Sequence, residues 1–109
     1  AITQREVSLV LETIVGNVHA SSGATVNSAT HTLILDTLGV ERCRFWLDTA
    51  DSMIHEGVGA LDHGPIATSR VTRFDLAGNA TTVEVSVLEM RSANGRLVRM
   101  STAAAFYNR

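Results

Sequence analysis

Hydrophobic residues near the N-terminus recur at spacings of three and four. This apolar stripe consists of Val7, Val10, Leu11, Ile14 and Val15. Such spacing places side chains on one face of a helix, so we predict a helix over residues 1–12. Residues 13–19 are predicted to form a strand. The turn signal Ala-Ser-Ser-Gly at 20–23 then leads to a second strand at Thr25 and Val26, whose β-branched side chains favour a pleated backbone.

The next section combines helix-capping residues with apolar positions. Asn27 and Ser28 carry side-chain oxygens that accept hydrogen bonds from first-turn amides, and Gly39 suits the left-handed end of a helix. We therefore predict a helix over residues 29–38. Between residues 40 and 54 the apolar residues again step by three and four, which predicts further helical turns that end at the glycines just beyond.

The last 45 residues have a different pattern, rich in Val and Thr, with alternating apolar and polar positions. This period of two predicts three strands, over residues 66–74, 80–90 and 97–106. Gly78 and Gly95 lie in the segments between them and suit tight turns. The end of the chain is therefore predicted to be three consecutive antiparallel strands.

Composition narrows the class of protein. A chain of 109 residues with 45% hydrophobic residues and a net charge of −2 suits one domain with one core. The balanced charge gives no reason to expect nucleic acid as a partner. Cys43 is the single cysteine, which excludes an internal disulfide and favours a reducing, cytoplasmic location. No apolar run approaches the roughly 20 residues that span a membrane.

Taken in order, several segments resemble PAS domains, a family of sensory modules. The segments are residues 22–39 (SGATVNSATHTLILDTLG), 48–64 (DTADSMIHEGVGALDHG), 73–90 (RFDLAGNATTVEVSVLEM) and 94–106 (NGRLVRMSTAAAF). The resemblance implies an α+β fold: a five-stranded antiparallel sheet of order 2-1-5-4-3, short helices between strands 2 and 3, and an N-terminal helix. In this interpretation residues 1–12 form a helical cap and residues 13–109 the sensor domain.

The resemblance also implies a function. A PAS-like chain would be a signal-input or protein-interaction module, for example of a two-component system, and would not itself be an enzyme. It would bind a small ligand or cofactor and pass its state to an attached effector domain. A homodimer through the N-terminal helix and the sheet is expected, since this family often dimerises in that way.

His55 is the first candidate site residue. The sequence His-Glu-Gly at 55–57 is similar to the segment that carries the proximal iron ligand of haem-binding PAS domains, which implies haem as a possible cofactor and His55 as its axial ligand. Arg70 would then donate to bound dioxygen across the pocket. The alternative is a histidine that is partly exposed or hydrogen-bonded to a neighbour.

Two further residue sets suggest cofactor chemistry. Cys43, in Arg-Cys-Arg-Phe-Trp, resembles the flavin-adduct cysteine of light-sensing relatives, although a buried structural thiol is the favoured interpretation. Asp48, Asp51 and His55 fall at i, i+3 and i+7 and could share a helix face as metal ligands. A solvated helix face is favoured there, and no metal site is predicted.

A ligand cavity and a catalytic alternative complete the candidates. The residues that could line a cavity, or simply fill a core, are Phe45, Trp46, Met53, Arg70, Phe74 and Met90. The alternative function comes from another class. The segments 46–51 and 81–106 also resemble hotdog-fold acyl-CoA thioesterases, in which Asp48, on a helix, would activate water.

Overall fold

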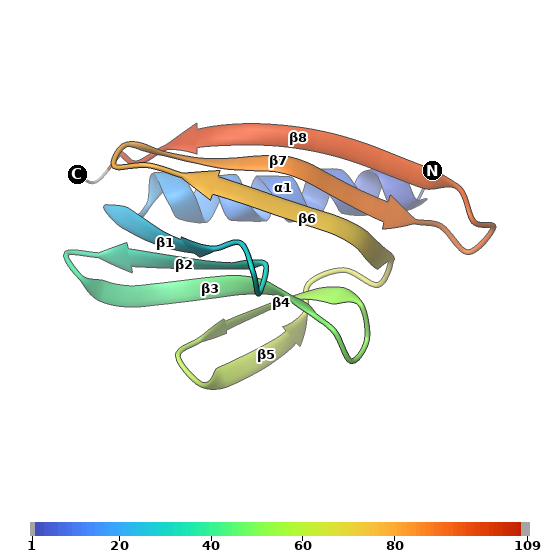
Figure 1. Ribbon diagram of the computed structural model, residues 1–109, viewed down its shortest axis with the longest axis horizontal. Coiled ribbons are helices and arrows are strands. Elements are labelled where there is room, and N and C mark those ends of the chain that lie inside the picture. The colour runs from blue at the N-terminus through green and yellow to red at the C-terminus, as the bar shows by residue number, and fades with distance from the viewer. Residues whose placement is uncertain (1, 108–109) are drawn as a thin grey trace.

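A computed structural model describes residues 2–107, which form one helix followed by eight strands (Figure 1). The elements are α1 (Ile2–His19), β1 (Gly23–Asn27), β2 (Thr32–Thr37), β3 (Val40–Asp48), β4 (Met53–Val58), β5 (Leu61–Pro65), β6 (Arg70–Gly78), β7 (Thr82–Arg91) and β8 (Leu97–Ala105). The fold is α+β, with an N-terminal helix and antiparallel sheets, as the sequence predicted at this level.

The N-terminal helix is confirmed and is longer than predicted. Val7, Val10 and Ile14 are buried at 0–1% exposure, so the predicted stripe faces the core. The strand predicted over residues 13–19 is wrong, because Val18, four residues after Ile14, extends the buried stripe by another turn. No described helix is long and apolar enough to cross a membrane.

The helix predicted over residues 29–38 is wrong, and most of that segment is strand β2. Leu33 and Leu35 are both fully buried and alternate with less buried neighbours, which is the period of a strand. Asn27 does accept amide hydrogen bonds, from Ala29 at 3.1 Å and Thr30 at 3.2 Å. It does so in the turn between β1 and β2, where an asparagine side chain stabilises a turn just as it would cap a helix.

Gly39 shows why a hairpin was mistaken for a helix end. Leu38 and Gly39 have φ angles of 53° and 82° and form the two-residue loop between Thr37 and Val40, which pair across β2 and β3. Two successive residues with positive φ are the mark of a hairpin turn that matches strand twist. A left-handed glycine thus serves a hairpin here, where a helix end was predicted.

The helical turns predicted over residues 40–54 are also wrong, because this segment forms β3 and the start of β4. Cys43 and Phe45 are buried on one face of β3, and Ile54 is buried on β4. The apolar residues of this segment alternate as in a strand, and some of them also happen to fall three or four residues apart, as they would in a helix. A long hairpin results, with Trp46 directly opposite His55.

The three strands predicted at the end of the chain are confirmed. Strands β6, β7 and β8 pair antiparallel in that order, and Gly95 lies in the turn between β7 and β8. The first strand begins at Arg70, later than predicted, because β5 and a short connection occupy residues 61–69. Gly78, predicted in the connecting turn, is instead the last residue of β6 and pairs with Val83.

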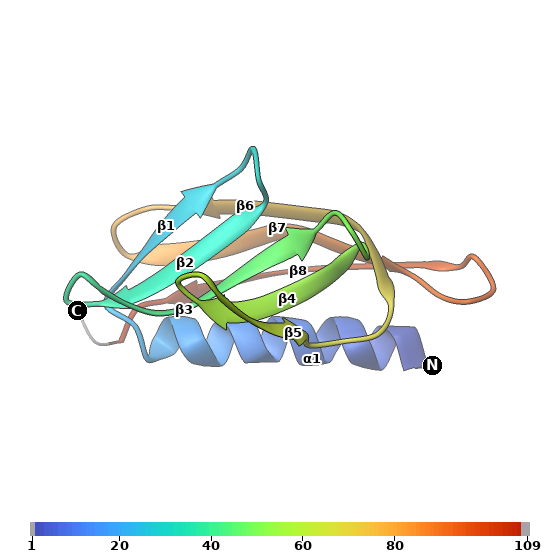
Figure 2. The ribbon, with the colours of Figure 1, turned by 90° about the horizontal axis from the view of Figure 1, so that it is seen from below.

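The strands form a five-stranded sheet, β1-β2-β3-β4-β5, and a three-stranded sheet, β6-β7-β8. Within each sheet every strand pairs with its neighbour in sequence, so the order 2-1-5-4-3 is not the order found. The short helices expected between strands 2 and 3 are hairpins within the described residues. Helix α1 lies along one side of the strands, closest to β7 and β8 (Figure 2).

The core lies between α1 and the two sheets. Its largest fully buried side chains are Phe45, Phe74, Ile14, Leu33, Leu35, Ile54, Leu88 and Met90. The two sheets meet where β1 approaches β6, and there His31 Nδ1 lies 2.8 Å from the carbonyl oxygen of Phe74. Residues from both sheets therefore contribute to one hydrophobic cluster.

Candidate functional site

The six predicted cavity residues do not come together around a cavity. Phe45, Phe74 and Met90 are fully buried members of the core, and their contacts are with other apolar side chains. Trp46 and Met53 are partly buried on β3 and β4, while Arg70 is exposed at the start of β6. The sequence left open that these residues fill the core. Phe45, Phe74 and Met90 do so.

His55 lies on strand β4 and not on the long helix that the PAS resemblance implied. Its residue exposure is 7%, and it sits between Trp46 on β3 and Pro65 on β5, its two cross-strand partners. The Trp46 and His55 rings are 5.7 Å apart between centroids. Two flanking strands therefore hold the imidazole in place.

Three carboxylates surround the His55 ring. The Nδ1 atom lies 3.0 Å from both carboxylate oxygens of Asp62 and 3.8 Å from Oδ2 of Asp48. The Nε2 atom lies 2.6 Å from Oδ2 of Asp51. We call these four residues the His55 cluster. Both ring nitrogens face carboxylates, so neither faces an open space in which a haem could lie.

Tight backbone turns hold the aspartates of this cluster. The second carboxylate oxygen of Asp48 accepts the Ala50 amide at 2.8 Å, and Asp51 likewise accepts the Met53 amide at 2.9 Å. Asp62 reaches the cluster from β5, where Oδ1 also accepts the Gly64 amide at 2.7 Å. Each carboxylate is thus oriented by its own chain before it meets the imidazole.

Gly57 makes the β4–β5 hairpin close enough for Asp62 to reach His55. A Cβ atom at this position would lie 2.0 Å from the carbonyl oxygen of Leu61, a distance that no side chain tolerates. The pairing of β4 with β5 shifts register between His55 and Gly57, which is the bulge that brings the strands together. The position therefore requires glycine.

The cluster changes the proton affinities of its members. Burial disfavours the charged His55 ring, but hydrogen bonds to Asp51 and Asp62 outweigh burial, so the pKa of His55 is raised. The hydrogen bond to His55 lowers the pKa of Asp51. The same partner, followed by the Gly64 amide, lowers the pKa of Asp62. The cluster therefore favours the protonated form of the ring and the ionised forms of Asp51 and Asp62.

The cluster differs from the metal site considered in the sequence. The helix spacing of Asp48, Asp51 and His55 does not apply, because these residues span a hairpin turn. The nearest potential ligand atoms of Asp48, His55 and Asp62 instead lie within 4.8 Å of one another. Asp62 was missed, since only the two-residue loop at Gly59 and Ala60 brings it opposite Gly57, within reach of the His55 ring. That glycine followed by a small residue is the signal that could have found it.

Cys43 and Asp48 do not have the surroundings that their candidate roles need. Cys43 is buried at 5% exposure, and burial raises the pKa of its thiol, which suits a structural residue. The thioesterase alternative required Asp48 to lie on a helix. Asp48 is instead the last residue of strand β3. Its carboxylate belongs to the His55 cluster.

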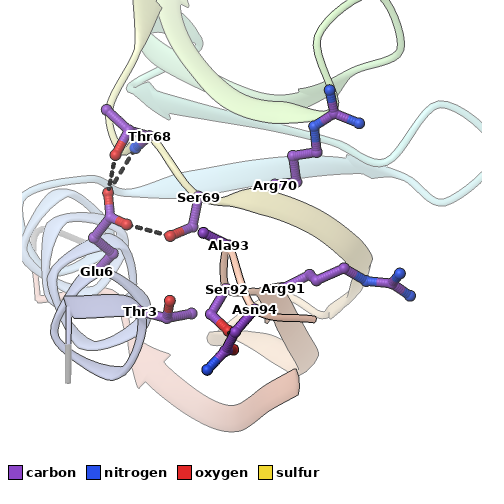
Figure 3. A pocket seen from close by; sticks show the side chains of 9 residues that line it. All are labelled: Thr3, Glu6, Thr68, Ser69, Arg70, Arg91, Ser92, Ala93 and Asn94. Atoms are coloured by element: carbon purple, nitrogen blue, oxygen red, sulfur yellow. Dashed lines mark hydrogen bonds between the residues drawn. The ribbon is translucent and has the colours of Figure 1, made fainter. Parts of the chain in front are cut away.

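A separate open hollow of about 860 Å³ lies where α1 begins (Figure 3). Its carboxylate, Glu6, accepts the Thr68 amide and hydroxyl, each at 2.7 Å, and the Ser69 hydroxyl. Burial raises the pKa of Glu6, but these donors outweigh it and lower the pKa overall. Arg70 and Arg91 extend away from Glu6 in Figure 3. Glu6 therefore serves to fasten the β5–β6 connection to the helix.

Strand β8 presents an open edge that the sequence analysis did not single out. It pairs with β7 on one side, and no strand lies beyond it in Figure 1. The amides of successive β8 residues point alternately toward β7 and away from it. The Phe106 amide donates to the Thr81 carbonyl oxygen, so the even-numbered amides point toward β7. Amides of residues 97, 99, 101, 103 and 105 therefore point away from β7.

A shallow groove runs between this edge and the helix. Its lining consists of Ser8, Leu11, Glu12 and Val15 from α1 and Met100, Ser101 and Thr102 from β8, and its volume is about 320 Å³. Most of its surface is apolar, and the Ser8 hydroxyl lies 3.6 Å from the sulfur of Met100. The edge and the helix thus form one continuous surface.

Comparison with models of protein families, with curated proteins and with solved structures finds no match to this chain.

Proposed function

We propose that this chain is a protein-interaction module for signal input, and that it acts as a homodimer joined edge to edge along β8. The resemblance to PAS domains supplies the signalling part of the proposal, together with an attached effector domain. The observation that carries the interaction part is the open edge of β8, nine residues long.

An open edge of this kind is a template for another strand. Natural edges are usually protected by charge, proline or a bulge that turns the strand away. Strand β8 contains no proline, and its single charged side chain, Arg99, is bound to Glu89 at 2.8 Å. Alanine or serine occupies positions 101, 103 and 105, so little bulk hinders an approaching backbone.

The edge is self-complementary. In an antiparallel pair of two β8 strands centred on Ser101, Arg99 of one copy lies opposite Ala103 of the other, and Leu97 lies opposite Ala105. No two like charges then face each other, which is the arrangement that would be unfavourable. A second copy of the chain is therefore the occupant that this edge fits.

The helix strengthens the same arrangement. Residues directly opposite in an antiparallel pair point to the same face, so Met100 of one copy would lie opposite Thr102 of the other, on the side of α1. The groove lined by Leu11, Val15 and Met100 would then lie beside the Met100 side chain of the second copy. This matches the dimer through helix and sheet that the sequence resemblance implied.

Sedimentation at several protein concentrations tests the proposal. The wild type is expected to dimerise, and Ala103→Lys, which places a charge on the exposed edge, is expected to weaken the dimer at least tenfold. Ala77→Lys, at an equally exposed alanine on β6, is the matched control and should leave the dimer intact. A monomeric wild type, or equal weakening by both lysines, would refute the proposal.

A further inference from the structure

We infer that Asp48, His55 and Asp62 bind a divalent transition-metal ion, with Zn²⁺ the best fit, and that Asp51 positions the His55 ring. This inference is independent of the β8 dimer, because the cluster lies on the β3–β5 hairpins and no residue of it belongs to β8.

Several carboxylate oxygens lie around one ring nitrogen of His55. His55 Nδ1 faces both Asp62 oxygens at 3.0 Å and an Asp48 oxygen at 3.8 Å. A single proton on Nδ1 can be shared by the two Asp62 oxygens, but the Asp48 oxygen at 3.8 Å lies beyond hydrogen-bond reach. One ligand atom each from Asp48, His55 and Asp62 lies within 4.8 Å of the others, and a metal ion bound at about 2.0–2.2 Å would draw them to separations of about 3–3.5 Å.

The other side of the ring also fits a metal site. In metal sites, a ligating histidine almost always donates its second N–H to a carboxylate or carbonyl, which fixes the tautomer and orients the ring. Asp51 Oδ2 lies 2.6 Å from Nε2 and fulfils that role. Nδ1 is then left with its lone pair toward Asp48 and Asp62, as ligation requires.

Burial and charge also favour a bound cation. The His55 side chain is only 9% exposed, held between Trp46 and Pro65, while Asp62 is 44% exposed and gives access from solvent. A nearby hollow of about 240 Å³ is lined by Asp62 and Arg44, but Arg44 is bound to both carboxylate oxygens of Glu41. A bound divalent cation would supply the positive charge that these carboxylates lack.

The ligand types select the class of metal. One imidazole nitrogen and two carboxylates suit Zn²⁺ and its first-row neighbours, with solvent completing the coordination. Ca²⁺ prefers six to eight oxygen ligands, and Mg²⁺ prefers oxygen and retains several waters. The cluster should therefore bind Zn²⁺ or Co²⁺ much more tightly than Ca²⁺.

Calorimetric titration of the chelator-treated protein with Zn²⁺ tests this inference, with thermal unfolding as the second readout. The wild type should bind one equivalent and unfold at a higher temperature when Zn²⁺ is present. Asp62→Asn and His55→Asn should lose at least tenfold in affinity along with the thermal shift. Asp51→Asn should weaken binding by about 10–100-fold, as expected for a positioning residue.

The matched control is His63→Asn, which removes an exposed histidine that pairs with Glu56 on the same hairpin. It should bind Zn²⁺ as the wild type does. Should His55→Asn fail to fold, the half-exposed Asp62→Asn decides the matter. A flat wild-type titration would overturn the inference and leave His55 as a structural histidine hydrogen-bonded to Asp51 and Asp62. Unchanged binding by Asp62→Asn, or equal loss in His63→Asn, would overturn it as well.

Discussion

The β3–β5 hairpins and the helix-backed sheet β6–β8 are built from the same kind of antiparallel pairing, yet they bury different chemistry. Around β4, a histidine and three aspartates occupy the space between strands. In the second sheet, Phe74, Leu88 and Met90 fill the same kind of space with apolar atoms against the first sheet and α1. The β3–β5 hairpins thus carry a polar cluster beside the shared apolar core, to which Phe45 and Ile54 of the same hairpins also contribute.

The largest expected effect is a loss of stability when a core side chain is truncated, and its size should differ between these two regions. Phe74→Ala removes a fully buried ring and should lower the free energy of unfolding by about 3–5 kcal/mol. Trp46→Ala, at a partly buried position beside His55, should cost clearly less because solvent already reaches part of the ring. Denaturant unfolding of both variants measures the difference. A greater loss for Trp46→Ala would contradict the division.

The second prediction addresses the close approach of β4 to β5. Gly57→Ala should cost about 3 kcal/mol, since its Cβ would meet the Leu61 carbonyl oxygen and force the hairpin apart. Gly16→Ala is the matched control: it lies within α1 with open space around it and should gain about 0.5–1 kcal/mol. Thermal unfolding of the two variants should therefore shift in opposite directions.

The third prediction concerns the turn between β1 and β2. Asn27→Ala removes the side chain that accepts the Ala29 and Thr30 amides and should cost about 1 kcal/mol. Asn27→Asp keeps the acceptor and serves as the control, with stability close to that of the wild type. If the alanine variant unfolds at the wild-type denaturant concentration, this turn does not depend on its asparagine.

The smallest expected effect is a pH dependence in the second sheet. The Thr72 hydroxyl, followed by Arg99, lowers the pKa of Glu89 below its usual value. A carboxyl whose pKa is lowered by folding stabilises the protein above its unfolded pKa, and this contribution is lost as the pH falls through the lowered value. Stability measured from pH 7 down to pH 3 should therefore fall less steeply in Glu89→Gln than in the wild type.

The two regions also differ in how well their helices and strands could be predicted from the sequence. The first part of helix α1 and strands β6–β8 were predicted because their apolar residues repeat with a recognisable period, whereas residues 13–19 of the helix were mistaken for a strand. The segment from 29 to 54 was mistaken for helix because Cys43 and Phe45 alternate among other apolar residues that also fit a helical spacing. Leu38 and Gly39 added to the error, since a left-handed residue ends helices and closes hairpins alike.

The His55 cluster was only partly predictable. His55, Asp48 and Asp51 were singled out, but their grouping was argued from a helix that does not form. Asp62 joins them through the register of β4 and β5, which depends on the bulge at Gly57. A bulge of this kind follows from local steric contact, and periodicity along the chain does not reveal it.

Disulfide trapping at the β8 edge tests the proposed homodimer most directly. In a pair centred on Ser101, both copies of that residue lie opposite each other at a Cα separation of about 5.5 Å, within the range of a disulfide. Ser101→Cys should therefore form a covalent dimer under mild oxidation. The native Cys43 is buried and should not compete.

Ala103→Cys is the matched control on the same exposed edge. Its two copies would lie about 14 Å apart in this register, too far for a disulfide. Cross-linking of Ser101→Cys with little cross-linking of Ala103→Cys, resolved by non-reducing electrophoresis, is the predicted result. Equal cross-linking of both variants, or none in either, would contradict a dimer joined along β8.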